Sequence, residues 1–142
     1  MTKKLRSQKG QCLCGAVSFT ADEVKAHFGA CHCRMCQRWS GGIFLTANAR
    51  GLTFEGADDI AIYRSSDWAE RGFCRKCGSL LFYRLLKADD YEICIGAFDD
   101  QSQFVLASEI FVDLKPAGYA LAGDHPRLTE AETLEKFKEF GA

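Results

Sequence analysis

Seven of the eight cysteines in this chain fall into three short clusters. The clusters are Cys12-Leu13-Cys14, Cys31-His32-Cys33-Arg34-Met35-Cys36 and Cys74-Arg75-Lys76-Cys77. Short cysteine spacings of this kind are typical of zinc sites, in which a structural ion has four protein ligands and a catalytic ion keeps one position open. Because seven thiolates cannot fill two tetrahedral sites, the sequence predicts one closed four-sulfur site and one three-sulfur site with a free position.

A disulfide framework is the other common use of clustered cysteines, and it needs an oxidising compartment. Residues 1–11 are polar and basic, unlike a signal peptide, and no stretch has the roughly 20 continuous apolar residues that a membrane span requires. We therefore expect a cytoplasmic protein without a membrane partner, in which reduced cysteines bind metal.

The charge of the chain does not favour a nucleic acid partner. Its 142 residues include 18 Lys and Arg against 19 Asp and Glu, which gives a formal net charge of -1 and no overall basic field. Screening of thiolate charge is the first interpretation of the basic residues close to the clusters, with ligand binding as the alternative; these residues are Arg34, Arg38, Arg71, Arg75 and Lys76.

Short alternating apolar segments between Gly, Asp and Asn turns predict a mainly β protein of packed antiparallel sheets. The expected strands cover residues 12–19, 26–30, 42–47, 52–54, 60–64, 79–83, 91–97 and 108–112. No repeat or composition break divides the chain, so we expect a single zinc-binding domain over residues 1–142.

One helix is expected near the C-terminus. Thr129 and Glu132 have the spacing of a capping box, which marks a helix start. Leu134, Phe137 and Phe140 then recur on one side of the helix, and this apolar stripe should dock on the sheet.

Glycine placement indicates which cysteines share the closed site. Gly15 and Gly78 each follow the second sulfur of a pair directly, and glycine permits the tight turn that points backbone N–H groups at a thiolate. Two such half-sites would form a four-cysteine clip that closes a long loop. The clip consists of Cys12, Cys14, Cys74 and Cys77, and it leaves Cys31, Cys33 and Cys36 as the three-sulfur site.

Three segments resemble the signature blocks of the glutathione-dependent formaldehyde-activating enzyme family, also called the centromere protein V domain. They are residues 10–17, residues 31–36 followed by Ser40-Gly41, and residues 71–79. The similar region covers roughly residues 9–119 and leaves a C-terminal tail and helix over residues 120–142. The resemblance implies an Mss4-like fold, with a structural zinc on Cys12, Cys14, Cys74 and Cys77 and a second zinc on Cys31, Cys33 and Cys36. It also implies a carbon-sulfur lyase that joins glutathione to formaldehyde and gives S-(hydroxymethyl)glutathione.

Such chemistry suits an open three-thiolate zinc. A free thiol has a pKa of about 8.5 and is mostly protonated at neutral pH, so coordination would supply the glutathione thiolate that attacks an aldehyde carbon. We therefore expect Cys31, Cys33 and Cys36 to be the catalytic residues. Three cysteinates leave the ion formally at -1, so it could act instead as a docking point for the thiol.

Other residues carry weaker signals. If residues 31–33 are extended, alternation points His32 away from the neighbouring sulfurs, and we expect an ordinary hydrogen-bonded histidine, with a proton shuttle or pocket-lining role as the alternative. Cys94 lies in an apolar segment and is expected to be buried and inert. Arg34, Arg38 and Arg71 are candidates for pairing with glutathione carboxylates.

Two positions depart from the family pattern. Glu109 and Gly118 stand where that pattern leads us to expect a histidine and an aromatic residue, so the natural substrate stays open. The rival hypothesis is a non-catalytic, zinc-stabilised binding module with an Mss4-like fold. A methionine sulfoxide reductase of related fold would need an isolated reactive cysteine, and Cys94 is expected to be too buried for that role. The sequence leaves the oligomeric state open.

Overall fold

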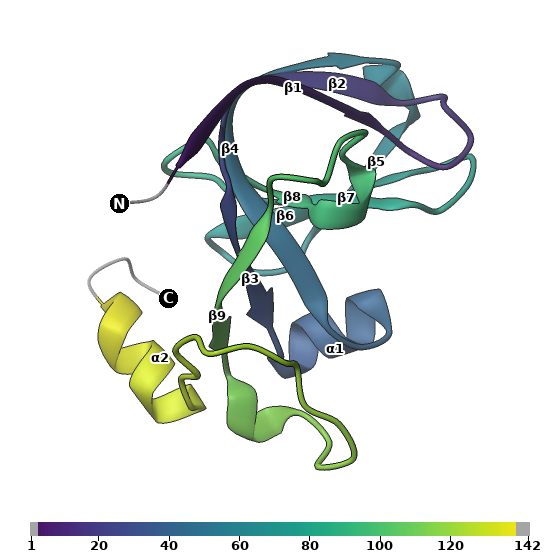
Figure 1. Ribbon diagram of the computed structural model, residues 1–142. Helices are drawn as coiled ribbons and strands as arrows, with labels where there is room; N and C mark the ends of the chain where they lie inside the picture. Colours follow the sequence, from purple (N-terminus) through teal and green to yellow (C-terminus); the bar gives the residue numbers. More distant parts are fainter. Residues whose placement is uncertain (1–2, 139–142) are drawn as a thin grey trace. The chain divides into compact units, whose positions relative to one another are not determined.

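The computed structural model describes residues 3–138 and consists mainly of antiparallel β-strands (Figure 1). The described residues form nine strands and two α-helices, the second of them short and C-terminal. The prediction of a mainly β fold with a C-terminal helix is confirmed. No helix in this part of the chain has the length and apolar character needed to cross a bilayer.

The chain groups into two compact units, each made of two separate segments. The first unit consists of residues up to His27 together with Thr46–Phe104, and the second consists of Phe28–Leu45 together with the residues from Val105 onward. The expectation of one zinc-binding domain stays a prediction, and each unit is described below by itself.

The first unit contains the larger part of the antiparallel sheet, with strand order β1-β2-β4-β8-β7-β6-β5. Figure 1 shows β1 and β2 side by side, and residues Lys4 and Gln11 of β1 pair with Lys25 and Ser18 of β2. Strand β4 begins in the second unit with its first two residues. The strands are β1 (Lys4–Gln11), β2 (Ser18–Lys25), β4 (Phe44–Glu55), β5 (Ile60–Arg64), β6 (Ala69–Cys74), β7 (Leu80–Leu85) and β8 (Asp90–Cys94), with 3-10 turns η1 (Ala57–Asp59) and η2 (Ile95–Ala97).

Aromatic side chains form the core of the first unit. The rings of Phe19 and Phe98 meet edge to face at 5.6 Å, and Phe82 meets Tyr91 in the same way at 5.0 Å. Phe54 lies between the two pairs, with its ring centroid 6.1 Å from Phe19 and 5.6 Å from Phe82. These ring contacts join β2, β4, β7 and β8, and β1 and β6, which pair with β2 and β7, lead to Cys12 and Cys74.

Several expectations about the strands of this unit were incomplete or wrong. Strand β4 is continuous where two strands were expected, and η2 replaces the end of the strand expected over residues 91–97. Residues 12–17 form a turn between β1 and β2 instead of a strand, which leaves Leu13 86% exposed while Val17 is fully buried. Strand β1 was missed because only Leu5 and Gly10 of its eight residues are buried. Strand β6 was not expected because its sequence, Ala-Glu-Arg-Gly-Phe-Cys, does not alternate between apolar and polar residues.

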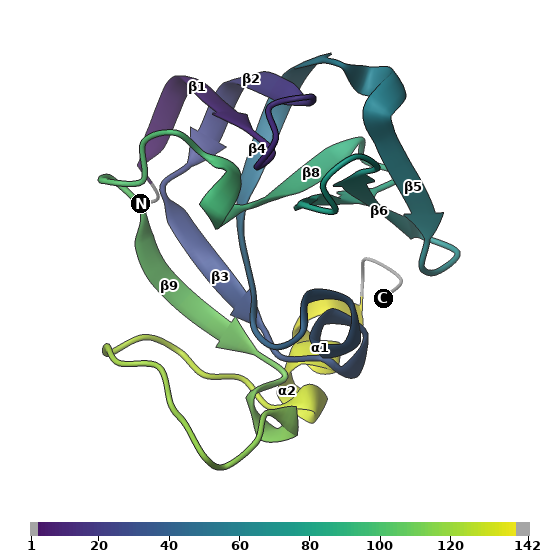
Figure 2. The same cartoon turned by 90° about the vertical axis from the view of Figure 1, so that its right-hand side faces the viewer.

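The second unit combines two strands with both helices. Strands β3 (His27–Cys31) and β9 (Val105–Ile110) pair with each other and lie side by side in Figure 2; only His27 of β3 belongs to the first unit. Helix α1 (Arg34–Ser40) follows β3, and the 3-10 turn η3 (Val112–Leu114) follows β9. Helix α1 was not among the elements expected from the sequence.

Helix α2 (Glu130–Phe137) begins at Thr129 with the predicted capping box, since Glu132 N donates to Thr129 Oγ1 at 3.2 Å and Thr129 N donates to Glu132 Oε1 at 2.9 Å. The helix contacts η3, and its buried residue is Thr133, whose Oγ1 accepts from Phe111 N at 3.3 Å. The predicted docking stripe is therefore wrong at Leu134, which is 44% exposed. Phe140 lies outside the described residues.

Candidate metal sites

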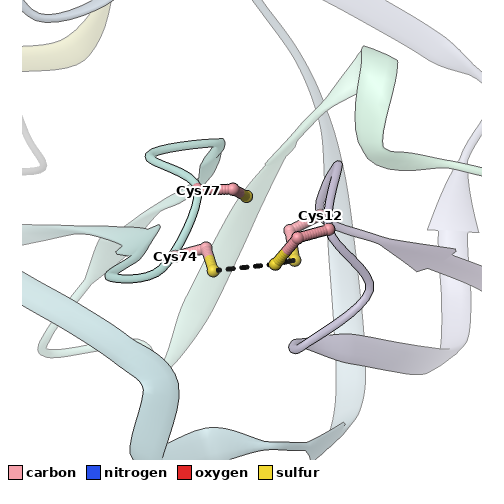
Figure 3. Close-up of side chains that lie close together, drawn as sticks. Cys12, Cys74 and Cys77 are labelled. Atoms are coloured by element: carbon pink, nitrogen blue, oxygen red, sulfur yellow. Dashed lines mark hydrogen bonds between the residues drawn. The ribbon is translucent and has the colours of Figure 1, made fainter.

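Four cysteines of the first unit converge on one point, as the sequence predicts. Their sulfur atoms all lie within 4.8 Å of one another, and Cys14 Sγ is 3.7 Å from Cys12 Sγ and 3.8 Å from Cys74 Sγ. Cys12 and Cys14 come from the turn after β1, Cys74 ends β6, and Cys77 lies in the turn before β7. Figure 3 shows Cys12 facing Cys74 and Cys77 across the site. This cluster could hold a metal ion.

Two glycine turns bring the sulfurs together. Gly15 N donates to Cys12 O at 3.2 Å and Gly78 N donates to Cys74 O at 2.8 Å, with φ angles of 81° and 79°. This left-handed conformation is one that glycine adopts without steric cost. Val17 N also points at the site and donates to Cys12 Sγ at 3.3 Å. The predicted role of the two glycines is confirmed.

The four thiols are not equivalent. Ser79 Oγ lies 3.1 Å from Cys77 Sγ, and the hydrogen bonds from its side chain and backbone lower the pKa of Cys77 to about 5. For Cys14 a hydrogen bond from the Ala16 backbone favours the thiolate, but burial and the neighbouring thiols outweigh it and raise the pKa of Cys14 to about 11. A cation that binds here therefore meets a ready thiolate at Cys77 and displaces the proton of Cys14.

The second cluster lies where β3 passes into α1. Cys31 ends β3, Cys33 is the N-cap of α1, and Cys36 lies in the first turn of the helix, so that their sulfurs fall within 4.8 Å of one another. Cys33 Sγ accepts from Cys36 N at 3.3 Å, as an N-cap side chain does. The thiols of Cys33 and Cys36, together with burial, raise the pKa of Cys31. This cluster could also hold a metal ion, which would displace the proton of Cys31.

Within the described residues, no fourth ligand of the usual kind joins the second cluster. Among residues 3–138, no other cysteine sulfur, histidine nitrogen or carboxylate oxygen belongs to the group of Cys31, Cys33 and Cys36. Thiolate donors suit zinc and other thiophilic ions, whereas magnesium and calcium prefer oxygen. The donor sets of both clusters therefore fit zinc.

His32 is bound to a carboxylate and is not a member of the sulfur cluster. Its side chain is fully buried, its Nε2 lies 2.8 Å from Glu109 Oε1, and its Nδ1 has no hydrogen-bond partner within the described part of the chain. The structure agrees with the expectation of a hydrogen-bonded histidine. The contact with Glu109 was not predicted, because nothing in the sequence indicates that this glutamate is buried.

The three candidate arginines differ in environment. Arg34 and Arg38 are exposed on α1, the helix that carries Cys33 and Cys36. Arg71 belongs to the first unit, where it is 2% exposed and its guanidinium carbon lies 5.1 Å from the centre of the Tyr83 ring. Only the first two therefore share a unit with the three-sulfur cluster.

Cys94 differs from the expectation of a buried residue. It is half-buried and lines a cavity of about 470 Å³ in the first unit, together with Leu13, Ser79 and Phe98. It does not belong to either cysteine cluster, so an eighth metal ligand is excluded for the described residues.

A mainly antiparallel β fold with a four-thiol and a three-thiol cluster defines a cysteine-rich β protein whose clusters could hold metal ions. The sequence model described as glutathione-dependent formaldehyde-activating enzyme matches residues 7–114, a region that contains all seven clustered cysteines. The chain belongs to this family.

Comparison with individual proteins agrees with this assignment. The chain is similar to a protein of Schizosaccharomyces pombe (strain 972 / ATCC 24843) named as an uncharacterized lyase, with 26% identity over 129 residues that cover 89% of this chain and 94% of the relative. A crystal structure of a Rhodobacter sphaeroides protein matches with a TM-score of 0.56 and 23% identity, over 84% of this chain and 98% of that one. The structural likeness supports the fold alone, and the family together with the lyase-named relative supports lyase activity.

Proposed function

We propose that this chain is a zinc-dependent carbon-sulfur lyase that joins glutathione to formaldehyde or another small aldehyde. The observation that carries the proposal is the difference between the two clusters. The first offers four sulfurs, whereas the second offers three and has no further cysteine, histidine or carboxylate ligand among residues 3–138. A zinc ion with three protein ligands keeps a position for a reactant, as catalytic zinc sites do.

The residues around the three sulfurs suit this role. Cys36 is 4% exposed, whereas Cys31 and Cys33 keep part of their surface exposed, so the site is anchored on one side and accessible to a small thiol. The N-cap hydrogen bond from Cys36 N holds Cys33 Sγ in place. When bound, zinc would lower the pKa of an incoming thiol and so supply the nucleophilic thiolate.

The proposed reaction is balanced without an oxidant or a reductant. The glutathione sulfur forms a bond to the aldehyde carbon, the C=O π bond breaks, and the proton that leaves the thiol ends on the former carbonyl oxygen. Exposed guanidinium groups on α1, Arg34 and Arg38, are placed to attract the carboxylates of glutathione. We therefore propose glutathione and a small aldehyde as the partners.

The proposal includes a reducing, cytoplasmic location. All eight cysteines are free thiols in the described residues, although short spacings such as that of Cys12 and Cys14 bring their sulfurs close together. Thiols persist as metal ligands where glutathione and thioredoxin keep them reduced.

Substitution of Cys33 by serine tests the proposal. The parent chain, Cys33→Ser and the control Cys94→Ser, a cysteine outside both clusters, are purified without chelator. Zinc per chain and the rate of glutathione–formaldehyde adduct formation are then measured. We expect two zinc ions in the parent and in Cys94→Ser, one in Cys33→Ser, and a rate for Cys33→Ser at the level of the uncatalysed reaction.

The same experiment separates the enzyme from a non-catalytic binding module. If Cys33→Ser is folded by circular dichroism and forms the adduct as fast as the parent, the catalytic assignment of the three cysteines is wrong. If the parent itself does not accelerate adduct formation with any small aldehyde, the binding module becomes the better description.

A further inference from the structure

A buried carboxylate in the second unit joins three segments of the chain. Glu109 of β9 has no exposed surface. Its Oε1 lies 2.8 Å from Nε2 of His32, and its Oε2 lies 2.7 Å from Nε2 of His125 and 3.0 Å from Nε of Arg127. We call these four residues the Glu109 cluster. It connects the segment between Cys31 and Cys33, strand β9 and the chain after η3.

The partners of Glu109 keep it ionised. Burial alone raises the pKa of a carboxyl group, but the hydrogen bonds from His125 and His32 and the charge of Arg127 outweigh burial and lower the pKa of Glu109. A carboxylate can only accept hydrogen bonds, so both histidines donate from Nε2. The orientation of the His32 ring is therefore fixed by Glu109.

His32 is also held through its main chain. Its N donates to Ile110 O at 3.1 Å, and its O accepts from Gln37 Nε2 at 2.6 Å. The same amide group of Gln37 donates to Leu114 O at 3.0 Å. With its ring bound to Glu109, His32 is fixed at three points. It is the residue between two of the three sulfur ligands, so these contacts also restrict the backbone that carries Cys31 and Cys33.

The C-terminal segment holds Glu109 in turn. Glu109 N donates to Pro126 O at 3.0 Å, and Leu128 N donates to Glu109 O at 2.9 Å. Arg127 Nη2 donates to Leu121 O and Gly123 O, so the segment is tied to itself as well as to the carboxylate. The partners of Glu109 in this segment, His125, Pro126, Arg127 and Leu128, lie after position 114, where the match to the family model ends.

We propose that Glu109 is a positioning residue of the three-cysteine site. Its carboxylate holds His32, and through the main chain of His32 it holds Cys31 and Cys33 in the arrangement that binds the metal ion. His125 and Arg127 hold Glu109 in turn. The inference rests on the proposed metal site and adds to it that residues 125–127, beyond the family-matched region, support metal affinity.

Titration with Co²⁺ under anaerobic, reducing conditions tests the proposal, because the visible bands of cobalt report both affinity and ligand geometry. The difference between the spectra of the parent chain and Cys33→Ser identifies the signal of the three-sulfur site. The test variants are Glu109→Gln and Arg127→Gln. Thr133→Ala is the matched control, because Thr133 is a buried residue of the same unit whose side-chain hydrogen bonds go to Phe111 N and Thr129 O and not to the Glu109 cluster.

We expect Glu109→Gln to weaken Co²⁺ binding at the three-sulfur site by about ten-fold to a hundred-fold, the usual effect of losing a partner that orients a metal site. Its cobalt bands should also shift, since the geometry of the sulfurs changes. Arg127→Gln, which keeps both histidine contacts, should show a smaller change in the same direction. Thr133→Ala should lower the melting temperature and leave the affinity and the bands unchanged.

Equal affinity and equal bands in the parent and in both test variants would overturn the role of Glu109, even if the variants melt at lower temperature. If Glu109→Gln does not fold, Arg127→Gln decides in the same way, because its side chain is 37% exposed and its loss leaves less buried surface disturbed. If the parent gives no cobalt signal beyond that of Cys33→Ser, the proposed metal site fails, and this inference fails with it.

Discussion

Ser79 Oγ lies 3.1 Å from Cys77 Sγ and accepts a hydrogen bond from Leu13 N at 2.9 Å. One hydroxyl group thus contacts both halves of the four-cysteine site, since Leu13 lies between Cys12 and Cys14. The hydroxyl donates to the Cys77 thiolate, which is why the pKa of this thiol falls to about 5. Ser79 therefore supports the thiolate form of one ligand and the position of two others.

Replacement of Ser79 by alanine should make metal uptake at the four-cysteine site more sensitive to pH. In the parent, Cys77 is a thiolate above a pH of about 5. In the variant, Cys77 should lose its proton only at a pH closer to the ordinary thiol pKa of about 8.5. Zinc affinity measured against a competing chelator should therefore fall more steeply below pH 7 than in the parent. Ser102→Ala is the control, because Ser102 contacts Asp100 and neither cluster. A variant whose affinity follows pH as the parent does would contradict this role of Ser79.

Each half of the four-cysteine site was predictable because its determinants are local in sequence. Each pair of cysteines is followed by a glycine, and the turns at Gly15 and Gly78 have the left-handed backbone that this pattern requires. Strand β5 was also predicted over residues 60–64, where the structure has it. Local spacing and alternation were therefore sufficient for these parts of the fold.

The surroundings of the three-cysteine site could not be predicted in the same way. Helix α1 depends on Cys33 acting as its N-cap, and a cysteine is not among the preferred capping residues. The contact between His32 and Glu109 joins positions 77 residues apart, and no local pattern indicates that this carboxylate is buried. Partners that are distant in sequence and polar in character leave no periodic signal.

Loss of the metal ion from the four-cysteine site should destabilise the first unit. Structural zinc sites in small peptides have apparent binding free energies of about 10 to 16 kcal/mol at neutral pH, so Cys74→Ser should unfold or loosen the chain. Cys74 is fully buried and ends strand β6. Thermal unfolding of the parent with and without chelator, compared with Cys74→Ser and Cys33→Ser, checks this. If chelation leaves the melting temperature of the parent unchanged, the structural role is wrong.

The arginines should separate into a substrate-binding and a structural group. Arg34→Gln removes an exposed charge from the helix that carries Cys33, so the KM for glutathione should rise several-fold while kcat and the melting temperature stay close to those of the parent. Arg71→Gln removes a buried guanidinium from the face of Tyr83, so the melting temperature should fall. Steady-state kinetics and thermal unfolding of both variants test the distinction. An unchanged KM in Arg34→Gln would remove this residue from the proposed substrate site.

The Glu109 cluster should make the chain sensitive to acid. The pKa of Glu109 is lowered in the folded chain, so its contribution to stability is complete above the unfolded pKa of about 4.3 and is lost as the pH falls through the lower folded value. Glu109→Gln cannot make this contribution at any pH. The free energy of unfolding of the parent should therefore exceed that of the variant most at neutral pH, and the difference should shrink as the pH falls below about 4. Denaturant unfolding of the parent and the variant, at equal zinc and at a series of pH values, measures it. A difference that stays constant down to acid pH would show that Glu109 acts through shape and not through its charge.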